Sequence, residues 1–433
     1  MGPANRLVGS QYQRMNLRQG NALRRSVFYL TLASAVAPLC SIGASHILLA
    51  VSFLGVLLAR EKLRFPPLKL PLALFFAGTV LSLSLSGHVL AGWPQVRKFY
   101  IFFLALLLIA SVVRQVEGVR QLVMWWVAAA TCSALWGLVQ FGQRFLAAKR
   151  LGGNLYNQLL ENRITGFMSL WMTFAGQLVI VLLMLGAFLM FSPQRKGWRL
   201  LAACAAVMCL ALALAMTRGP WVGAAAGLVY LLWHWNRKWL VALPALAVLG
   251  FLASPAAVRE RVVSIVRPHS YLDSNQHRIV TWRTGLEMVK AHPWFGIGPE
   301  QVRPQFDRYV PADISRPLPW GWYGHLHNIY LQYAAERGIP VLLVFLWLMG
   351  RVLKDFWLAA AKQPPGRGPA RAVLHGCIAA IIAVLVAGFF EHNLGDSEVL
   401  QMFLTLIAVG YVASEPACPP GQVAAESPQV QVF

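Results

Sequence analysis

Long apolar segments recur along almost the whole chain, and they constrain the fold more than any other feature. Each is close to the ~20 residues that an α-helix needs to cross the hydrocarbon core of a bilayer. Because backbone polar groups cannot be left unpaired in hydrocarbon, such segments predict helices rather than loops or open sheets. The twelve segments cover residues 27–42, 43–59, 70–86, 99–113, 121–142, 167–191, 200–216, 219–235, 239–253, 338–358, 372–390 and 397–413. We therefore expect an all-α, polytopic integral membrane protein with about twelve transmembrane helices.

Composition supports this class and excludes others. Hydrophobic residues make up 58% of the 433 residues and charged residues only 12%, and the mean hydropathy is +0.56. A soluble domain carries about 25% charged residues, so a soluble enzyme, a disordered chain and an ordinary DNA-binding protein are excluded. The expected surroundings are membrane lipids, and no nucleic acid partner is expected. The net charge of +22 then reflects either orientation in the membrane or a site for an anion.

The first two segments decide the orientation, because 27–59 could also form one long helix. Pro38 and the turn-forming run Ser41-Ile42-Gly43 favour a break. With twelve spans, 21 of the 38 Lys and Arg residues lie in cytoplasmic segments and 7 in short outside segments. Merging the first two spans leaves 12 inside and 16 in short outside segments, against the positive-inside rule. Twelve spans with both termini in the cytoplasm are therefore predicted.

This orientation divides the chain into five parts. They are a cytoplasmic N-terminal arm (1–26), transmembrane helices 1 to 9 (27–253), a long outside loop (254–337), transmembrane helices 10 to 12 (338–413) and a disordered cytoplasmic tail (414–433). Ten Lys and Arg residues and seven acids lie in the outside loop, which is too long for the positive-inside rule to explain its charge.

Within the outside loop, the sequence predicts an amphipathic helix over about 276–291. Four apolar residues recur there at helical spacing: Ile279, Trp282, Leu286 and Val289. Such a helix can lie on the helix bundle or at the membrane interface. The run His292–Gly298 ends it, and the glycines of that run permit a tight turn or a close backbone approach.

Two arginines of the outer side have competing interpretations. Arg218, in Thr217-Arg218-Gly219-Pro220-Trp221, lies between two predicted spans with almost no loop around it. It is either a snorkelling anchor at the interface or a planar fork for phosphate oxygens held between two packed helices. For Arg278, the residues alone favour a solvated position on the amphipathic helix.

A histidine of the same loop is a candidate for proton transfer. His327 is followed by Asn328, a good N-cap for the helix predicted to follow, and helix N-termini attract anions. Taken alone, a histidine in this position is more often structural. His325 and His327 are a weak metal signal without a third ligand, and there is no Asp-x-Asp, so no metal or other cofactor is expected.

Taken together, these residues resemble a known family. His325-Leu326-His327-Asn328, followed after nine residues by Gly338-Ile339-Pro340, resembles the His-Asn-x9-Gly signature of bacterial O-antigen ligases. Thr217-Arg218-Gly219 and the run His292–Gly298, with Arg278 upstream of it, are similar to the same pattern. Val341 stands where ligases more often have Gly, Thr or Tyr, so the related O-antigen polymerases stay open as an alternative.

The resemblance implies a glycosyltransferase with a GT-C-like membrane fold in a Gram-negative inner membrane. Its periplasmic catalytic loop would transfer a glycan from undecaprenyl diphosphate to a sugar of the lipid A core. The amphipathic helix would admit the two lipids from the bilayer. No carboxylate pair for a covalent intermediate is apparent in the sequence, so a metal-independent, inverting single displacement is expected.

The resemblance also implies the roles of individual residues. Arg218 and Arg278 would clamp the diphosphate, and His327 would accept a proton from the attacking hydroxyl or orient it. Substrate contacts are further expected from four residues: His325, Asn328, Trp221 and Gly298. Glu391 and Asp396, on the last outside turn, are expected as partners of an arginine or of His327.

A protein of another class, a transporter of the lipid-linked glycan, is the remaining alternative. Transporters place charged groups near the bilayer midplane within broken helices. Here the spans are nearly free of charge and the candidate residues lie on one outer face, which favours an enzyme.

Overall fold

The computed structural model describes residues 22–193, 197–268, 270, 272–273 and 275–415, and this part of the chain is helical with no β-strand. The prediction of an all-α protein is confirmed. Most of the predicted arm (1–26) and of the predicted tail (414–433) lies outside the described residues. Residues 22–36 are helical, so the first helix extends further toward the N-terminus than the predicted span 27–42.

In the described part of the chain, twelve long helices overlap the twelve predicted segments. They are the helix over 22–36, α2 (Ile42–Leu58), α3 (Lys69–Leu85), α5 (Phe99–Val112), α6 (Val116–Leu151), α8 (Trp171–Phe191), α9 (Trp198–Leu214), α10 (Arg218–Trp235), α11 (Lys238–Ala253), α16 (Ile339–Lys362), α17 (Pro369–Ala387) and α18 (Ser397–Ser414). Among the described residues, five helical stretches are long and apolar enough to cross a membrane: Val89–Val112, Val116–Leu151, Trp171–Phe191, Pro369–Ala387 and Ser397–Ser414. Four further apolar helices are shorter, so the total of twelve spans stays a prediction.

The break between the first two helices is where the sequence predicts it. A short 3-10 helix, η1 (Ala37–Leu39), carries Pro38, and α2 begins after Ser41. The Ser41 side chain accepts a hydrogen bond from the Ala44 amide at 3.3 Å and so caps α2. The chain reverses here, because the first helix and α2 contact each other in antiparallel order. The Ser45 hydroxyl donates to the Ser34 carbonyl, and the Thr31 and Ser52 hydroxyls are hydrogen-bonded. The count of twelve segments requires this reversal.

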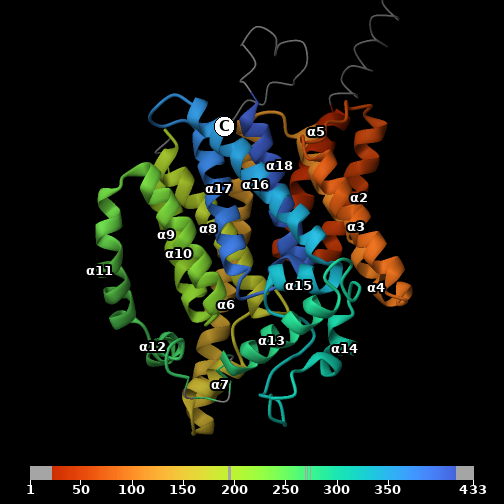
Figure 1. The fold of residues 1–433 in the computed structure, drawn as a ribbon. Coiled ribbons are helices and arrows are strands. Elements are labelled where there is room, and N and C mark those ends of the chain that lie inside the picture. Colours follow the sequence, from red (N-terminus) through yellow and green to blue (C-terminus); the bar gives the residue numbers. More distant parts are fainter. Residues whose placement is uncertain (1–21, 194–196, 269, 271, 274, 416–433) are drawn as a thin grey trace, which may run out of the picture.

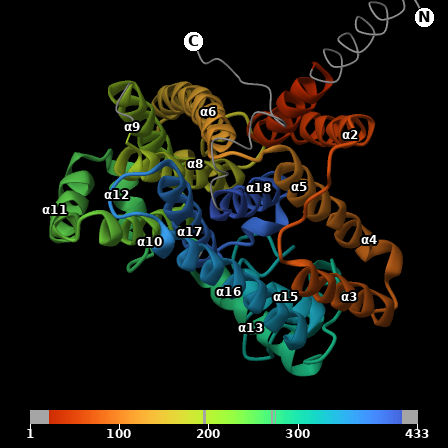
Figure 2. The same cartoon turned by 90° about the horizontal axis from the view of Figure 1, so that it is seen from above.

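The helices pack side by side, and shorter elements gather at one end of the bundle, which we call the loop end (Figure 1). The short elements are α4 (Val89–Arg97), α7 (Leu155–Glu161), α12 (Ala256–Val263), α13 (Asn275–Ala291), α14 (Val302–Tyr309), α15 (Ile329–Arg337) and η2 (Asn393–Gly395). Helix α17 packs against α8, α10, α16 and α18 and is buried along most of its length. Helix α11 has no buried residue and stands at the edge of the bundle in both views (Figures 1 and 2).

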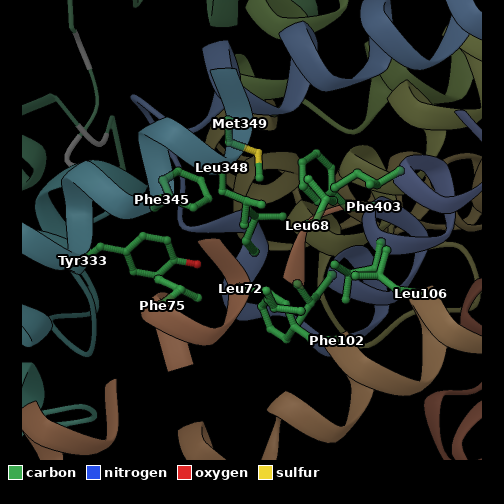
Figure 3. Close-up of a pocket in the computed structure, with 14 residues that line it drawn as sticks. Leu68, Leu72, Phe75, Phe102, Leu106, Tyr333, Phe345, Leu348, Met349 and Phe403 are labelled. Carbon is green, nitrogen blue, oxygen red and sulfur yellow. The ribbon is translucent and has the colours of Figure 1, made fainter. Parts of the chain in front are cut away.

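The long apolar helices pack tightly on one another and form one large apolar core. This packing leaves little empty space in the bundle. Its apolar core contains a cavity of only about 20 Å³ between α3, α5, α16 and α18, about the space of one water molecule. The cavity is lined by apolar side chains and Tyr333, whose hydroxyl points inward (Figure 3). None of the described residues that line this cavity is charged, so it is not a candidate site for binding a phosphate.

The predicted amphipathic helix is present as α13, but its faces are the reverse of the simplest expectation. Its buried side is formed by residues between the predicted apolar positions: His277, Val280, Thr281, Thr284, Gly285 and Met288. Ile279 and Leu286 of the predicted apolar stripe are 56% and 50% exposed. Trp282 and Val289 of the same stripe are half-buried, so the stripe only partly faces the surroundings, beside charged residues such as Arg283 and Lys290. The opposite face, which carries no ionisable side chain apart from His277, packs on the protein.

Candidate functional site

A buried carboxylate at the loop end joins two of the predicted site residues. Glu391 lies in the turn between α17 and α18 and is 3% exposed. The Arg278 guanidinium of α13 donates from Nη2 to Glu391 Oε1 at 2.6 Å. His327 Nδ1 lies 3.6 Å from Glu391 Oε2, an ion-pair distance. Two residues that are far apart in the sequence therefore share one carboxylate.

The electrostatics of this group favour a negative charge on Glu391. Burial by itself raises the pKa of a carboxyl group. The positive charge of Arg278 and the neighbouring His327 outweigh that effect and hold the pKa of Glu391 at about 2. The carboxylate is therefore ionised at neutral pH and available to orient both partners.

The backbone around His327 explains the spacing of the signature. His327 has a left-handed φ of 49°, and its amide donates to His325 Nδ1 at 3.2 Å. Asn328 caps α15, since its Oδ1 accepts from the Leu331 amide at 2.9 Å. Helix α15 then runs for nine residues and ends at Gly338, whose φ is 85°. The nine residues between Asn and Gly are thus this helix.

Gly338 is required by a close approach of two backbone segments. A Cβ there would lie 2.1 Å from the carbonyl oxygen of Trp294, and the Ile339 amide donates to the Pro293 carbonyl at 2.8 Å. The end of α15 is therefore held against the turn that follows α13. This contact connects α13, which carries Arg278, to α15, which begins directly after His327 and its cap Asn328.

Three more histidines surround His327. The ring centroids of His325 and His277 lie 4.1 and 5.1 Å from that of His327, and His392 lies 5.8 Å from His325. Burial, together with the neighbouring His327, lowers the pKa of His277 to about 4 and that of His325 to about 3. Burial also holds the pKa of His392 well below its ordinary value. These three rings are therefore neutral at neutral pH.

Arg218 approaches the same turn from α10. It is 6% exposed, and its Nη1 donates to the Ser264 carbonyl at 3.1 Å. The next residue, Gly219, packs directly on the Glu391 side chain, because a Cβ there would lie 2.9 Å from Glu391 Cγ. Arg218 lies within electrostatic range of Arg261 and Arg278. The Thr-Arg-Gly motif therefore places a second guanidinium near the Arg278–Glu391 pair.

Two further arginines extend the positive region and were not predicted from the sequence. Arg261 of α12 is 2% exposed, pairs with Asp273 at 3.0 Å and donates from Nε to the Met216 carbonyl at 3.1 Å. Arg163, in the loop after α7, is electrostatically coupled to Arg261, Glu391 and Arg278. Neither lies in a recognisable motif, and only the packing of α7, α10 and α12 brings them here.

The remaining predicted residues lie elsewhere. Asp396 is on the same turn as Glu391 but accepts a hydrogen bond from Thr173 Oγ1 at 2.7 Å, and burial raises its pKa to about 6. The Trp221 indole donates to the Leu212 carbonyl at 2.8 Å. Gly298 packs against Ser86, and its amide donates to the Glu336 carbonyl at 3.0 Å. These contacts stabilise the surrounding fold.

No group of three or more His, Cys, Asp or Glu residues is arranged to hold a metal ion within the described ranges. His277 and His392 lie in the site but are not among the residues predicted from the sequence. Each has one sequence signal that could have pointed to it: His277 directly precedes Arg278, and His392-Asn393 is a second His-Asn pair.

Comparison with known proteins bears on the same region. Residues 203–346 match a family model described as O-antigen ligase, which supports membership of the O-antigen ligase superfamily, as the motifs predict. No curated protein matches the chain. The matched segment contains Arg218, Arg278 and His327 but ends before Glu391. Ligases and polymerases of this family are glycosyltransferase-like, which supports an enzyme that acts on a lipid-linked glycan and a polysaccharide acceptor.

Proposed function

We propose that this protein is an O-antigen ligase that moves a glycan from undecaprenyl diphosphate to a sugar of the lipid A core. The observation that carries the proposal is the shared contact of His327 and Arg278 with Glu391. It joins a candidate base to a candidate phosphate-binding group at one end of an apolar helix bundle. The reaction needs these two groups next to each other.

The arginines supply what the donor requires. A diphosphate is already a good leaving group, so its departure is promoted by neutralising charge rather than by a strong general acid. Arg278 uses Nη2 for Glu391, and its buried Nε has no hydrogen-bond partner among the described residues. Guanidinium donors held in a preorganised geometry stabilise developing phosphate charge by a few kcal/mol each. Arg218 would act as the second such group.

His327 supplies what the acceptor requires. Its Nδ1 faces Glu391 and its Nε2 lies 3.3 Å from the Trp322 carbonyl, which can only accept a hydrogen bond. To act as the base, His327 therefore carries its proton on Nδ1, directed at the Glu391 carboxylate, and Nε2 exchanges the Trp322 carbonyl for the sugar hydroxyl. In that state Nε2 accepts the proton of the attacking hydroxyl. The hydroxyl oxygen bonds to the anomeric carbon as the bond from that carbon to the diphosphate oxygen breaks. Glu391 Oε1 accepts from Arg278 and Oε2 faces His327, so the carboxylate positions these two groups, and we infer an inverting single displacement, without a metal ion, rather than a covalent intermediate on Glu391.

The proposed setting is the inner membrane of a Gram-negative bacterium, with the loop end in the periplasm and both termini in the cytoplasm. The distribution of Lys and Arg over the short loops supports this orientation. The interfacial face of α13 would let the two lipid substrates reach the site from the bilayer.

The polymerase that extends the same glycan on the same carrier is the alternative within this superfamily. The same arginines and histidine would serve its donor, so only the acceptor distinguishes the two activities. A transporter is less compatible, since the charged groups gather at one end of the bundle rather than within broken helices at its centre.

The test is deletion of the gene followed by complementation with wild-type protein or the His327→Ala variant. If the protein is a ligase, the deletion strain accumulates long polymer on the carrier and makes lipopolysaccharide with a bare core. A core that carries one repeat unit would instead identify a polymerase. The variant should insert and fold normally but fail to restore the polymer, and wild-type lipopolysaccharide from it would refute the role of His327.

A further inference from the structure

A second cavity lies beside the candidate base and is not used by the mechanism above. It has a volume of about 260 Å³ and is formed by α14 and the segment that leads to His325. Its lining combines aromatic and charged groups, notably Arg303, Asp307, Trp322 and Tyr323. We call it the Trp322 pocket.

The backbone of the pocket wall contacts the histidines directly. The Trp322 carbonyl lies 3.3 Å from His327 Nε2 and 3.1 Å from His277 Nε2. The Tyr323 ring lies 4.5 Å from that of His277 and 4.8 Å from that of Phe306. Trp322 therefore touches both the pocket and His327 Nε2, so a molecule in the pocket lies one residue away in space from the candidate base.

The side chains that face the pocket are available for a ligand. Trp322 is 53% exposed, and Arg303 is exposed and makes no hydrogen bond or ion pair with another described residue. The Asp307 carboxylate pairs with Arg316 at 3.1 Å on one oxygen and is 78% exposed. An indole face packs on the C–H face of a sugar ring, while a guanidinium and a carboxylate bind adjacent hydroxyls through paired hydrogen bonds.

The size of the pocket and its charge narrow the class of ligand. Its volume is near the lower limit of about 300 Å³ for small-molecule sites, which suits a single sugar unit of a longer chain. A lipid tail does not fit the pocket, because it would bury the charged side chains of Arg303 and Asp307 against hydrocarbon.

We propose that the Trp322 pocket binds one sugar unit of the acceptor oligosaccharide, adjacent to the unit whose hydroxyl attacks. This inference rests on the proposed function. The donor diphosphate is expected on the Nδ1 side of His327, where Glu391 and Arg278 lie, whereas the pocket lies on the Nε2 side. The donor glycan has the same sugar chemistry, so the experiment has to separate the two sources.

The experiment measures binding rather than transfer. Full-length protein in lipid nanodiscs is titrated with delipidated core oligosaccharide or with a delipidated fragment of the surface polymer, and saturation-transfer NMR reports the bound sugar. We expect the core oligosaccharide to bind, and Trp322→Ala or Arg303→Ala to weaken binding at least 10-fold. Trp322→Phe should retain most of it. Arg308→Ala, on the same helix but outside the pocket lining, is the matched control and should bind as the wild type does.

Several outcomes overturn the inference. Binding of the polymer fragment but not of the core would assign the pocket to the donor glycan or to the glycan acceptor of a polymerase, and either result overturns the inference. Equal binding by wild type and Trp322→Ala would exclude the pocket. In transfer assays, Trp322→Ala should raise the KM for the acceptor and leave that for the donor unchanged. The His327→Ala protein should still bind the core oligosaccharide. If that variant also retained transfer, the proposed mechanism would fail while the pocket assignment stood.

Discussion

Replacing Glu391 by Gln tests whether this carboxylate organises the site. The substitution keeps the shape of the side chain and removes its charge. In the wild-type protein the carboxylate is 3% exposed and lies 2.6 Å from Arg278 Nη2. After substitution, the Arg278 guanidinium keeps its charge without a carboxylate partner, and the Nδ1–H form of His327 loses the group that favours it.

The expected loss of stability in Glu391→Gln follows from the burial of the ion pair between Arg278 and Glu391. Removing one partner of a fully buried ion pair costs about 3–5 kcal/mol. Because the Arg278 side chain is 14% exposed and part of its charge is solvated, we expect the free energy of unfolding to fall by about 3 kcal/mol, the lower end of that range. Misorientation of a general base lowers turnover by roughly 10²–10⁴-fold.

The assay is transfer by purified protein in nanodiscs, at a temperature where circular dichroism shows both proteins to be folded. Asp396→Asn is the matched control, because Asp396 lies on the same turn but bonds to Thr173 rather than to the site. That variant should keep transfer within about 10-fold of wild type. Turnover of Glu391→Gln within threefold of wild type would refute the organising role.

Three other predictions address the loop end and its chemistry. Gly338→Ala should lower the free energy of unfolding, measured by denaturant titration, by about 2 kcal/mol or more, because its φ is 85° and the new Cβ would lie 2.1 Å from the Trp294 carbonyl oxygen. Gly350→Ala is the control: a Cβ there would have no other atom within 4 Å, so the same titration should show a neutral or slightly stabilising effect. Transfer should be unchanged in EDTA, and activity lost there and restored by a divalent ion would contradict the metal-free mechanism. The pKa of His277 is lowered to about 4 by burial and by His327, so the unfolded chain binds more protons between that value and the ordinary 6.5. Thermal stability should therefore fall from pH 7 to pH 5, and less in His277→Gln; equal slopes would contradict this.

Local signals were sufficient wherever the structure depends on neighbouring residues in the chain. Apolar length located the helices, Pro38 and Ser41 marked the reversal after the first one, and Asn328 marked the start of α15. Helix ends were less well predicted. Helix α6 extends from 116 to 151, beyond the predicted 121–142, because residues that favour helix, such as Glu117, Arg144 and Lys149, continue it outside the apolar segment.

Other features depend on which surfaces meet, and only the tertiary structure decided them. The apolar stripe of α13 could be identified from the sequence. That the opposite face of this helix packs on the protein could not be predicted. Glu391 was a plausible partner by its position, yet its simultaneous contact with Arg278 and His327 depends on how α10, α13 and α17 converge. Arg163 and Arg261 gave no signal, since a basic residue in a loop is ordinarily solvated.

The sequence by itself therefore determined the class of protein, the positions of its helices and the motif residues Arg218, Arg278 and His327. Hydropathy and capping are properties of short stretches of chain, so they can be predicted without knowing the fold. The carboxylate that joins two of those residues, the neutral histidines around them and the pocket beside Trp322 were decided by tertiary structure. Electrostatic and shape complementarity act between segments that are distant in sequence, and packing alone brings those segments together.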